Sequence, residues 1–202
     1  MSLPGLWARA RSWRRAMTGP APRVAIVTGS ESGIGRATAV ALAERGCDIG
    51  ITWYREHEAA AATVEEVRAL GRRAEVRPVD LTRLPQAADV VDELAEALGG
   101  VDVLVNDAGT GHSTALLGTD FATWREVLAT DLDAAFLRLQ RAARRTVAAG
   151  RGGRIVNITS VHEHQPRVGA AAYCAAKGGL GLLTRVLSRR AAPAAAPGPG
   201  RG

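Results

Sequence analysis

Cysteines and long hydrophobic runs are scarce in this chain. The 202 residues include only two cysteines, Cys47 and Cys174, at positions that suggest neither a disulfide framework nor a metal site. No apolar run approaches the roughly 20 residues that a membrane-spanning helix needs. We therefore expect a soluble protein of the reducing cytoplasm that has no membrane partner.

Acidic residues are absent from both ends of the chain. Residues 1–22 and 183–202 each hold four arginines and no acid. Removing these eight from the 26 basic residues leaves 18 basic against 20 acidic side chains in the middle of the chain, so the net charge of +6 belongs to the ends. A slightly acidic middle does not favour a nucleic-acid partner.

The two ends also lack the apolar periodicity of regular structure. Residues 1–22 superficially match an organelle transit peptide, but no helical apolar stripe runs through them, which favours a short extension ahead of Met17. Residues 188–202 hold repeated proline and glycine and no aliphatic side chain larger than alanine. Such a segment buries too little surface to offset its ordering entropy. We expect a disordered extension over 1–22 and a disordered tail over 188–202, around one domain at 23–187.

Between these ends, short aliphatic segments alternate with helical ones. The pattern predicts strands at 23–28, 48–53, 101–106 and 153–159, and a further strand that ends at 79–80. It predicts helices at 33–45, 56–70, 85–98, 121–149 and 172–187. Strands that alternate with helices of this length indicate βαβ units, and therefore an α/β fold with a parallel sheet covered on both faces.

The first predicted strand runs into the turn TGSESGIGRA, residues 28–37. Gly29 permits a tight turn, Gly33 lets the backbone approach phosphates, and Gly35 lets the next helix pack on the strand. A turn of this kind presents backbone N–H groups and the positive end of a helix dipole to a pyrophosphate. An ordinary βα turn is the alternative, but the position between a predicted strand and a predicted helix favours dinucleotide binding.

Tyr173 and Lys177 lie four residues apart in a predicted helix, and therefore on one face of it. A phenol titrates near pH 10, so a tyrosine that acts as a base at neutral pH needs a change of roughly 3 units, about 4 kcal/mol. A lysine charge about 4 Å away supplies about 4 kcal/mol at an effective dielectric of ~20. The pair is therefore a candidate acid–base centre.

Several segments, taken in order, resemble the short-chain dehydrogenase/reductase family over about residues 23–187. They are TGSESGIG, VDL at 79–81, NDAG at 106–109, NITS ending at Ser160, and YCAAK at 173–177, with Asp107 in place of the family's second asparagine. The resemblance implies a doubly wound Rossmann fold. It also implies an NAD(P)-dependent enzyme that transfers a hydride between the cofactor and a secondary alcohol or ketone. The stretch SVHEHQP, residues 160–166, further resembles the glucose 1-dehydrogenase branch.

The resemblance assigns roles to the matched residues. Tyr173 is the acid–base group, Lys177 lowers its pKa and holds the nicotinamide ribose, and Ser160 donates a hydrogen bond to the reacting oxygen. Asp131 takes the place of a family asparagine, where a carboxylate can pair with Lys177 and weaken its pull on Tyr173. The expected cofactor contacts are Gly29, Ser30, Ser32, Gly33, Ile34, Gly35, Tyr54, Arg55, Asp80, Leu81, Asn106, Ala108, Gly109, Tyr173 and Lys177.

The choice of cofactor and the absence of a metal are further expectations. Arg55 follows the second predicted strand, where NAD-preferring enzymes carry an acid, so it favours the 2′-phosphate of NADP. Glu31 in the turn argues for NAD instead. His162, Glu163 and His164 have no further ligand nearby, so we predict no metal site, and the resemblance places them at the rim of the substrate pocket.

Beyond the Tyr–Lys helix the family continues with a strand similar to IRVNxVxPG, a substrate-covering segment and a final strand. None of these is in the sequence, and a frameshift near Leu187 is our hypothesis. We therefore expect a Rossmann fold that lacks its last strands, and the alternative to an active enzyme is a fragment that binds nucleotide without turnover. The family's homodimer or homotetramer, formed through 121–149 and the Tyr–Lys helix, would lose part of its usual interface.

Overall fold

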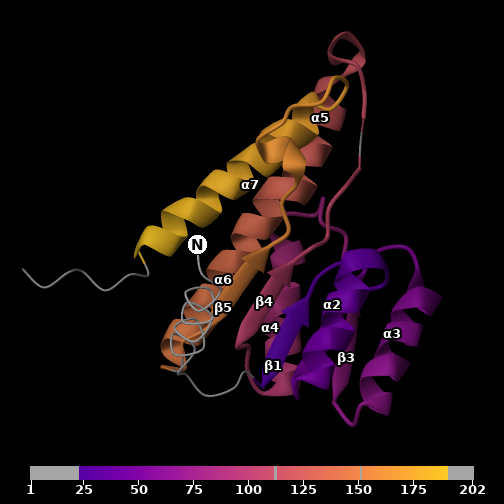
Figure 1. The fold of residues 1–202 in the computed structure, drawn as a ribbon, viewed down its shortest axis with the longest axis vertical. Coiled ribbons are helices and arrows are strands. Elements are labelled where there is room, and N and C mark those ends of the chain that lie inside the picture. The colour runs from indigo at the N-terminus through magenta and orange to yellow at the C-terminus, as the bar shows by residue number, and fades with distance from the viewer. Residues whose placement is uncertain (1–22, 112, 151, 191–202) are drawn as a thin grey trace, which may run out of the picture.

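Five parallel strands form the centre of the computed structural model, which describes residues 23–111, 113–150 and 152–190 (Figure 1). Across the sheet their order is β3 (Ala74–Pro78), β2 (Asp48–Trp53), β1 (Val24–Val27), β4 (Val103–Asn106) and β5 (Arg154–Asn157). The chain winds outward from β1 to β3 and then returns to place β4 on the other side of β1. This order confirms the predicted doubly wound α/β fold and creates a switch point between β1 and β4.

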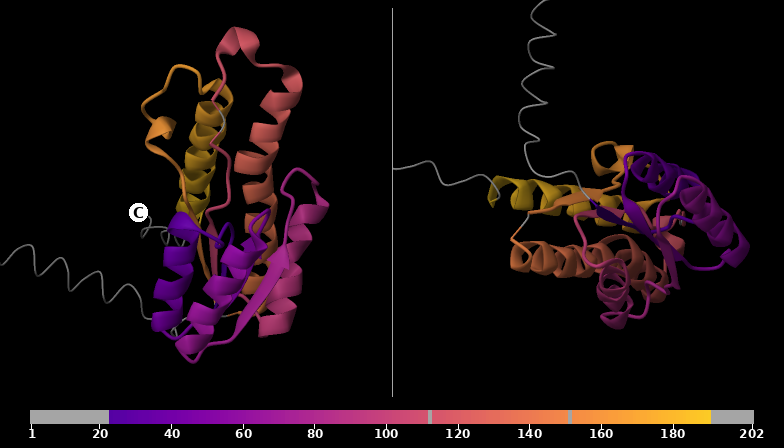
Figure 2. Two further views of the ribbon diagram at one scale, coloured as in Figure 1. Left: turned by 90° about the vertical axis from the view of Figure 1, so that its right-hand side faces the viewer. Right: turned by 90° about the horizontal axis from the view of Figure 1, so that it is seen from below.

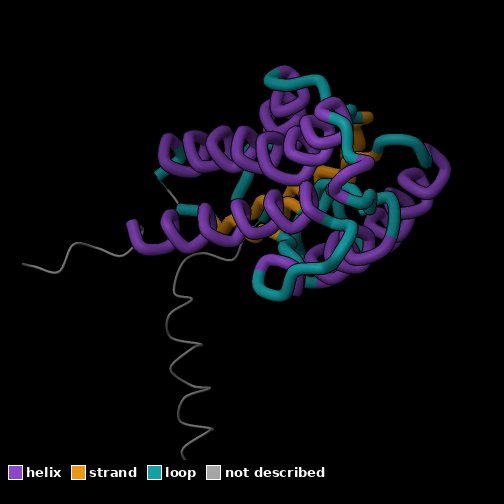
Figure 3. The backbone as a smooth tube through the Cα atoms, turned by 90° about the horizontal axis from the view of Figure 1, so that it is seen from above, coloured by secondary structure: helices purple, strands orange, loops and turns teal. Residues whose placement is uncertain are grey.

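Helices cover both faces of the sheet (Figures 1 and 3). On one face lie α2 (Gly33–Glu44) and α3 (His57–Ala69), and on the other lie α4 (Val90–Leu98) and α6 (Ala134–Ala148). Two further helices, α5 (Phe121–Leu128) and α7 (Ala171–Arg190), pack side by side (Figure 2). The part of the chain that the structure describes has no helix long and apolar enough to cross a bilayer.

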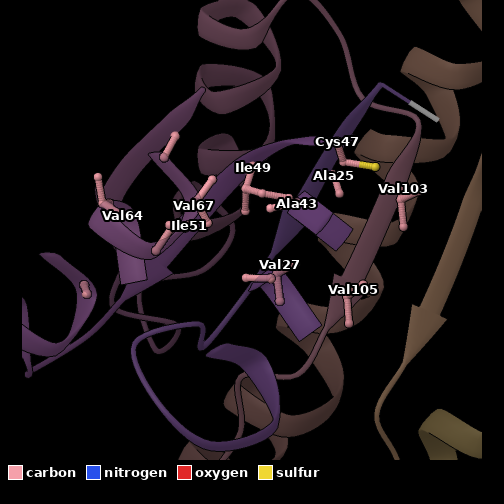
Figure 4. Close-up of a cluster of buried hydrophobic side chains, with 13 residues drawn as sticks. Ala25, Val27, Ala43, Cys47, Ile49, Ile51, Val64, Val67, Val103 and Val105 are labelled. Atoms are coloured by element: carbon pink, nitrogen blue, oxygen red, sulfur yellow. The ribbon is translucent and has the colours of Figure 1, made fainter. Parts of the chain in front are cut away.

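Successive residues of the central strands face two different hydrophobic cores. Ala25 and Val27 of β1 point toward α2 and α3 (Figure 4), whereas Ile26 between them packs against α4. All three side chains have no exposed surface, which explains why β1 reads as a continuous aliphatic run rather than an alternating one. Full burial of a valine or isoleucine side chain contributes on the order of 2 kcal/mol, so the sheet's centre is the rigid platform for the loops above it.

Every predicted strand and helix is present, with three informative differences. The predicted helix 85–98 begins as the 3-10 turn Gln86–Asp89, and α4 starts at Val90. The predicted helix 121–149 is interrupted by the π-helical turn Ala129–Asp133 between α5 and α6, and such turns are frequent at functional sites. Helix α7 continues through Arg190, three residues past its predicted end. The predicted extension over 1–22 and the tail from 191 onward lie outside the described residues.

Strand β5 is the edge of the sheet as far as the described residues extend. It pairs with β4 in parallel register, with Asn106 opposite Asn157. The Val156 side chain is 45% exposed, unlike the aliphatic residues of β1. The sheet therefore has one thinly covered edge, as the predicted loss of the last strands implies.

Candidate active site

A cleft of about 680 Å³ lies at the carboxyl ends of the strands, beside the switch point between β1 and β4. Open α/β sheets bind their ligands at this position. The loops that follow β1, β2, β3 and β4 each contribute to its walls. The predicted cofactor residues that line it are Gly29, Ser32, Gly33, Ile34, Tyr54, Arg55, Asp80, Leu81, Ala108 and Gly109.

The glycine turn leaves no room for side chains at two of its positions. A Cβ atom on Gly35 would lie 2.2 Å from the carbonyl oxygen of Gly29, and a Cβ on Gly29 would lie 2.9 Å from the Cα of Ala108. Gly29 also has a φ of +66°, which glycine adopts without strain. The turn therefore brings its backbone close to the start of α2, where Gly33 and Ile34 line the cleft.

Thr28, at the end of β1, fixes this turn to the loop after β4. Its Oγ1 accepts hydrogen bonds from the backbone N–H groups of Asp107 and Ala108, at 3.1 and 3.2 Å. The side chain of Thr28 is completely buried. Two loops that are distant in the sequence are thus joined into one wall of the cleft.

Ser30, Gly35 and Asn106 are predicted cofactor residues that do not line the cleft. The buried Ser30 hydroxyl donates to the carbonyl oxygen of Val27 at 2.8 Å and accepts from the N–H of Thr52 at 3.3 Å, so it joins β1 to β2. Asn106 donates through Nδ2 to Oδ1 of Asn157 at 2.9 Å and joins β4 to β5. These side chains support the walls of the cleft from behind.

Several cleft residues are not among the predicted cofactor contacts, although Glu31 and Asp107 stand out in the sequence for other reasons. They are Glu31, Thr52, Trp53, Val79, Thr82, Asp107, Thr110, Glu126 and Thr130. Thr52 and Asp107 were discoverable, because residues at the carboxyl end of a predicted parallel strand lie at this edge of the sheet. Glu126 and Thr130 come from α5 and the π-helical turn, where no local motif marks them.

A carboxylate and a guanidinium, those of Asp80 and Arg55, lie near each other at one end of the cleft. Asp80 accepts hydrogen bonds from the Thr82 hydroxyl at 2.7 Å and from the Thr82 N–H at 3.0 Å. These hydrogen bonds, together with the charges of Arg83 and Arg55, hold the pKa of Asp80 below its usual value. The Arg55 guanidinium lies 5.0 Å from the centre of the Tyr54 ring. This end therefore offers an ionised acceptor, an aromatic face and an exposed cation.

Asp107 places a second carboxylate against the glycine turn. Burial raises the pKa of Asp107 above its usual value, while a hydrogen bond from the Gly35 N–H and the charge of Lys177 act in the opposite direction. A Cβ on Gly35 would lie 2.9 Å from Oδ2 of Asp107. The departure from the family's asparagine therefore puts a titratable group beside the glycine turn.

Tyr173 and Lys177 lie on one face of α7, as their spacing predicts. The Lys177 ammonium nitrogen is 5.6 Å from the centre of the Tyr173 ring and donates to the carbonyl oxygen of Ile158 at 3.2 Å. A Cβ on Gly109 would lie 3.3 Å from that nitrogen, so Lys177 reaches the wall of the cleft at Gly109. Tyr173, Lys177 and Ser160 lie beside the cleft and are not among its lining residues.

Ser160 caps the short 3-10 turn Val161–Glu163. Its Oγ accepts the backbone N–H of His162 at 3.1 Å, which leaves the hydroxyl hydrogen available for donation to another oxygen. The His162 ring meets the Tyr173 ring edge to face, with centroids 6.3 Å apart. The turn that carries Ser160 therefore packs against the face of α7 that carries Tyr173.

Asp131 pairs with Lys177, as its place in the sequence predicts. Oδ1 of Asp131 lies 3.3 Å from the Lys177 nitrogen, and both side chains are buried. Oδ2 accepts hydrogen bonds from the Thr110 hydroxyl at 2.7 Å and the Thr110 N–H at 3.0 Å. The π-helical turn thus brings a carboxylate directly to the candidate acid–base pair.

In the 160–166 stretch, His164 pairs with Glu163, and His162 contacts the backbone of Gln165. Nε2 of His164 lies 2.7 Å from Oε1 of Glu163, and Nδ1 of His162 lies 2.9 Å from the carbonyl oxygen of Gln165. In the described ranges of the chain, no group of three or more histidine, cysteine or acidic residues is arranged to hold a metal ion.

Comparison with known proteins identifies the family. The model of the short chain dehydrogenase family matches residues 23–196, and the chain belongs to this family. It is 49% identical over 166 residues to the uncharacterized oxidoreductase YohF of Escherichia coli strain K12, a match that covers 82% of this chain and 66% of that protein. The chain therefore spans just under two thirds of the length of that relative.

Solved structures show the same relationship. The crystal structure of acetoin dehydrogenase YohF from Salmonella typhimurium matches with a TM-score of 0.82 and 47% identity, over 84% of this chain and 67% of that one. A short chain dehydrogenase from Burkholderia cenocepacia J2315, solved in complex with NADP, matches with a TM-score of 0.76 and 36% identity, over 83% of this chain and 68% of that one. These matches confirm the predicted family and fold, whereas the resemblance to glucose 1-dehydrogenase stays a prediction.

Proposed function

We propose that this chain is an NADP-dependent oxidoreductase that transfers a hydride between the cofactor and a secondary alcohol or ketone. The observation that carries the proposal is the position of Tyr173 and Lys177, which share one face of α7 beside a cleft built on a glycine turn. Family membership supports the same reaction class.

Three features of the cleft support NADP as the cofactor. The N–H groups at the start of α2 would hold the pyrophosphate, Asp80 would accept from the adenine amino group, and Arg55 would bind the 2′-phosphate. The NADP complex of the Burkholderia cenocepacia relative supports this choice over NAD. When bound, NADP supplies the carbon that accepts the hydride.

The three side chains beside the cleft divide the proton chemistry of alcohol oxidation among them. Tyr173, as its phenolate, takes the proton of the substrate hydroxyl as the carbon–hydrogen bond breaks. The Lys177 charge stabilises that phenolate, and the Ser160 hydroxyl donates a hydrogen bond to the substrate oxygen. In the reverse direction Tyr173 returns the proton to the oxygen of the ketone.

The substrate class follows from the solved relative rather than from the cleft. The Salmonella typhimurium structure is described as an acetoin dehydrogenase, so small α-hydroxyketones and the matching diketones are our proposed substrates. We also carry the family's homodimer or homotetramer and a cytoplasmic location as proposals.

The test is hydride transfer by the whole chain. NADPH oxidation is followed with diacetyl and acetoin, and NADP reduction with acetoin and simple secondary alcohols. We expect turnover with at least one α-hydroxyketone or diketone and a preference for NADP over NAD. Saturable NADPH binding without turnover on any of these compounds would overturn the proposal and favour a nucleotide-binding fragment.

Arg55 is expected to select for NADP. In Arg55→Leu the dissociation constant of NADPH should rise about tenfold to a hundredfold, because a charge-assisted contact to phosphate is lost, while that of NADH should stay within about twofold. Arg83→Leu is the matched control, since Arg83 is an exposed arginine near Asp80 that does not line the cleft. Equal weakening of both cofactors in Arg55→Leu would contradict this role.

A further inference from the structure

Arg138 on α6 is a buried cation that packs against β4. Its side chain has no exposed surface, and its Nε donates to Oδ1 of Asn106 at 2.9 Å. The two terminal nitrogens, Nη1 and Nη2, meet no hydrogen-bond acceptor in the described part of the chain. Buried charges are normally paired, so an arginine held this way needs an electrostatic reason.

The nearby negative charge belongs to Asp131. Arg138 follows Asp131 by seven residues, about two helical turns, and burial lowers the pKa of Arg138 to about 10 while the charge of Asp131 opposes this change. Arg138 therefore stays protonated at neutral pH. The Asp131 carboxylate thus interacts with two cations, Lys177 at 3.3 Å and Arg138 on α6.

The Asp131 carboxylate poses a problem for the proposed mechanism, and the charge of Arg138 offsets it. A carboxylate 3.3 Å from Lys177 cancels much of the positive charge that Tyr173 needs for its phenolate. We propose that Arg138 is a positioning residue that balances the charge of Asp131, so that Lys177 retains a net positive field beside Tyr173. The catalytic meaning of this inference rests on the proposed function.

A line of hydrogen bonds fixes Arg138 in place and links it to α7. Asn106, which accepts from Arg138, donates to Asn157 at 2.9 Å, and Asn157 donates to the Thr184 hydroxyl at 2.9 Å. Thr184 lies on the same helix as Tyr173 and Lys177. The guanidinium is therefore held by β4, β5 and α7 together, which keeps its charge at a constant position relative to the pair.

Titratable groups approach the Tyr173–Lys177 pair from three neighbouring segments. Asp131 comes from the π-helical turn, Asp107 from the loop after β4, and His162 from the 3-10 turn after Ser160. Asp107 and His162 are unchanged in every variant described below. A difference between variants therefore reports the Asp131–Arg138 balance.

The chain offers a direct probe that needs neither substrate nor cofactor. Tyr54 and Tyr173 are its only tyrosines, so in a Tyr54→Phe background the ultraviolet absorbance of phenolate reports Tyr173 alone. In that background we expect Arg138→Met to raise the midpoint of the titration by about one pH unit, and Asp131→Asn to lower it by a similar amount. The double variant should return close to the parent.

Three further variants separate charge from structure. Arg138→Lys retains the charge and should keep the parent's midpoint, whereas Arg138→Gln retains a donor for Asn106 without the charge and should shift like Arg138→Met. Arg141→Met, on the same helix but paired with Asp89 and Asp92, should cause no shift. If Arg138→Met does not fold, the comparison of Arg138→Lys with Arg138→Gln is the test. Equal midpoints of the phenolate titration in these two variants would overturn the inference.

Turnover distinguishes this inference from the proposed function. In an active enzyme, Arg138→Met should move the acidic limb of the kcat/KM profile upward by about one pH unit, an approximately tenfold loss on that limb, with an unchanged dissociation constant for NADPH. An equal loss at every pH would show a purely structural role and overturn the inference. If the wild-type chain shows no turnover, but the phenolate midpoints still differ between the variants as described, the charge balance is supported and the proposed function is removed.

Discussion

Replacement of Tyr173 by phenylalanine is expected to lower kcat by about 10³-fold or more. The substitution removes the hydroxyl that we propose exchanges a proton with the substrate oxygen, on a ring whose centre lies 5.6 Å from the Lys177 nitrogen. It keeps the aromatic ring that packs edge to face against His162. The binding surface therefore persists, and the dissociation constant of NADPH should change by no more than about threefold.

Tyr54→Phe is the matched control for this prediction. It removes the same hydroxyl from the other tyrosine of the chain, which is exposed at the Arg55 end of the cleft. We expect its kcat to stay within about fivefold of the wild type, because no proton transfer is assigned to that end. A Tyr173→Phe enzyme that keeps more than about a tenth of the wild-type kcat would remove Tyr173 from the chemistry.

Gly35→Ala is expected to destroy cofactor binding and to destabilise the fold. The new Cβ would lie 2.2 Å from the carbonyl oxygen of Gly29 and 2.9 Å from a carboxylate oxygen of Asp107. Because the first of these contacts is with the backbone, the turn must open and α2 must move away from β1. We expect the free energy of unfolding to fall by about 3 kcal/mol and NADPH affinity to fall more than about a hundredfold.

The control is Gly178→Ala on α7. A Cβ at that position meets nothing within 4 Å, and alanine is favoured over glycine in a helix by about 1 kcal/mol. Denaturant unfolding should therefore show equal or higher stability, and NADPH should bind as in the wild type. If Gly35→Ala bound NADPH as tightly as Gly178→Ala does, the glycine turn would not be the pyrophosphate site.

The sheet and its helices were largely predictable from local pattern. β1 and β4 are buried on both faces, so they read as short aliphatic runs, and glycines follow many of the helices. The π-helical turn at Ala129–Asp133 was not predictable, because it preserves the apolar pattern of a continuous helix. Within it, Asp131 accepts a hydrogen bond from the Thr110 hydroxyl.

The site residues that belong to sequence motifs were predictable. Those whose side-chain orientation depends on packing in the folded protein were not. Lys177 and Asp131 meet as their positions suggested, because each belongs to a recognisable segment. Ser30 lies in the glycine turn but its side chain turns inward to join β1 to β2. Arg138 reads as an exposed helix residue, and only the packing of α6 on β4 shows it to be buried.

Titration of the whole chain with NADPH is the most direct measurement of dinucleotide binding in the cleft. Trp53 lines the cleft, so energy transfer from tryptophan to reduced nicotinamide follows binding at this site. We expect a saturable signal with about one NADPH per chain, and weaker binding of NADH because Arg55 has no phosphate to contact. A signal that does not saturate, or that is the same in wild type and Gly35→Ala, would contradict dinucleotide binding in this cleft.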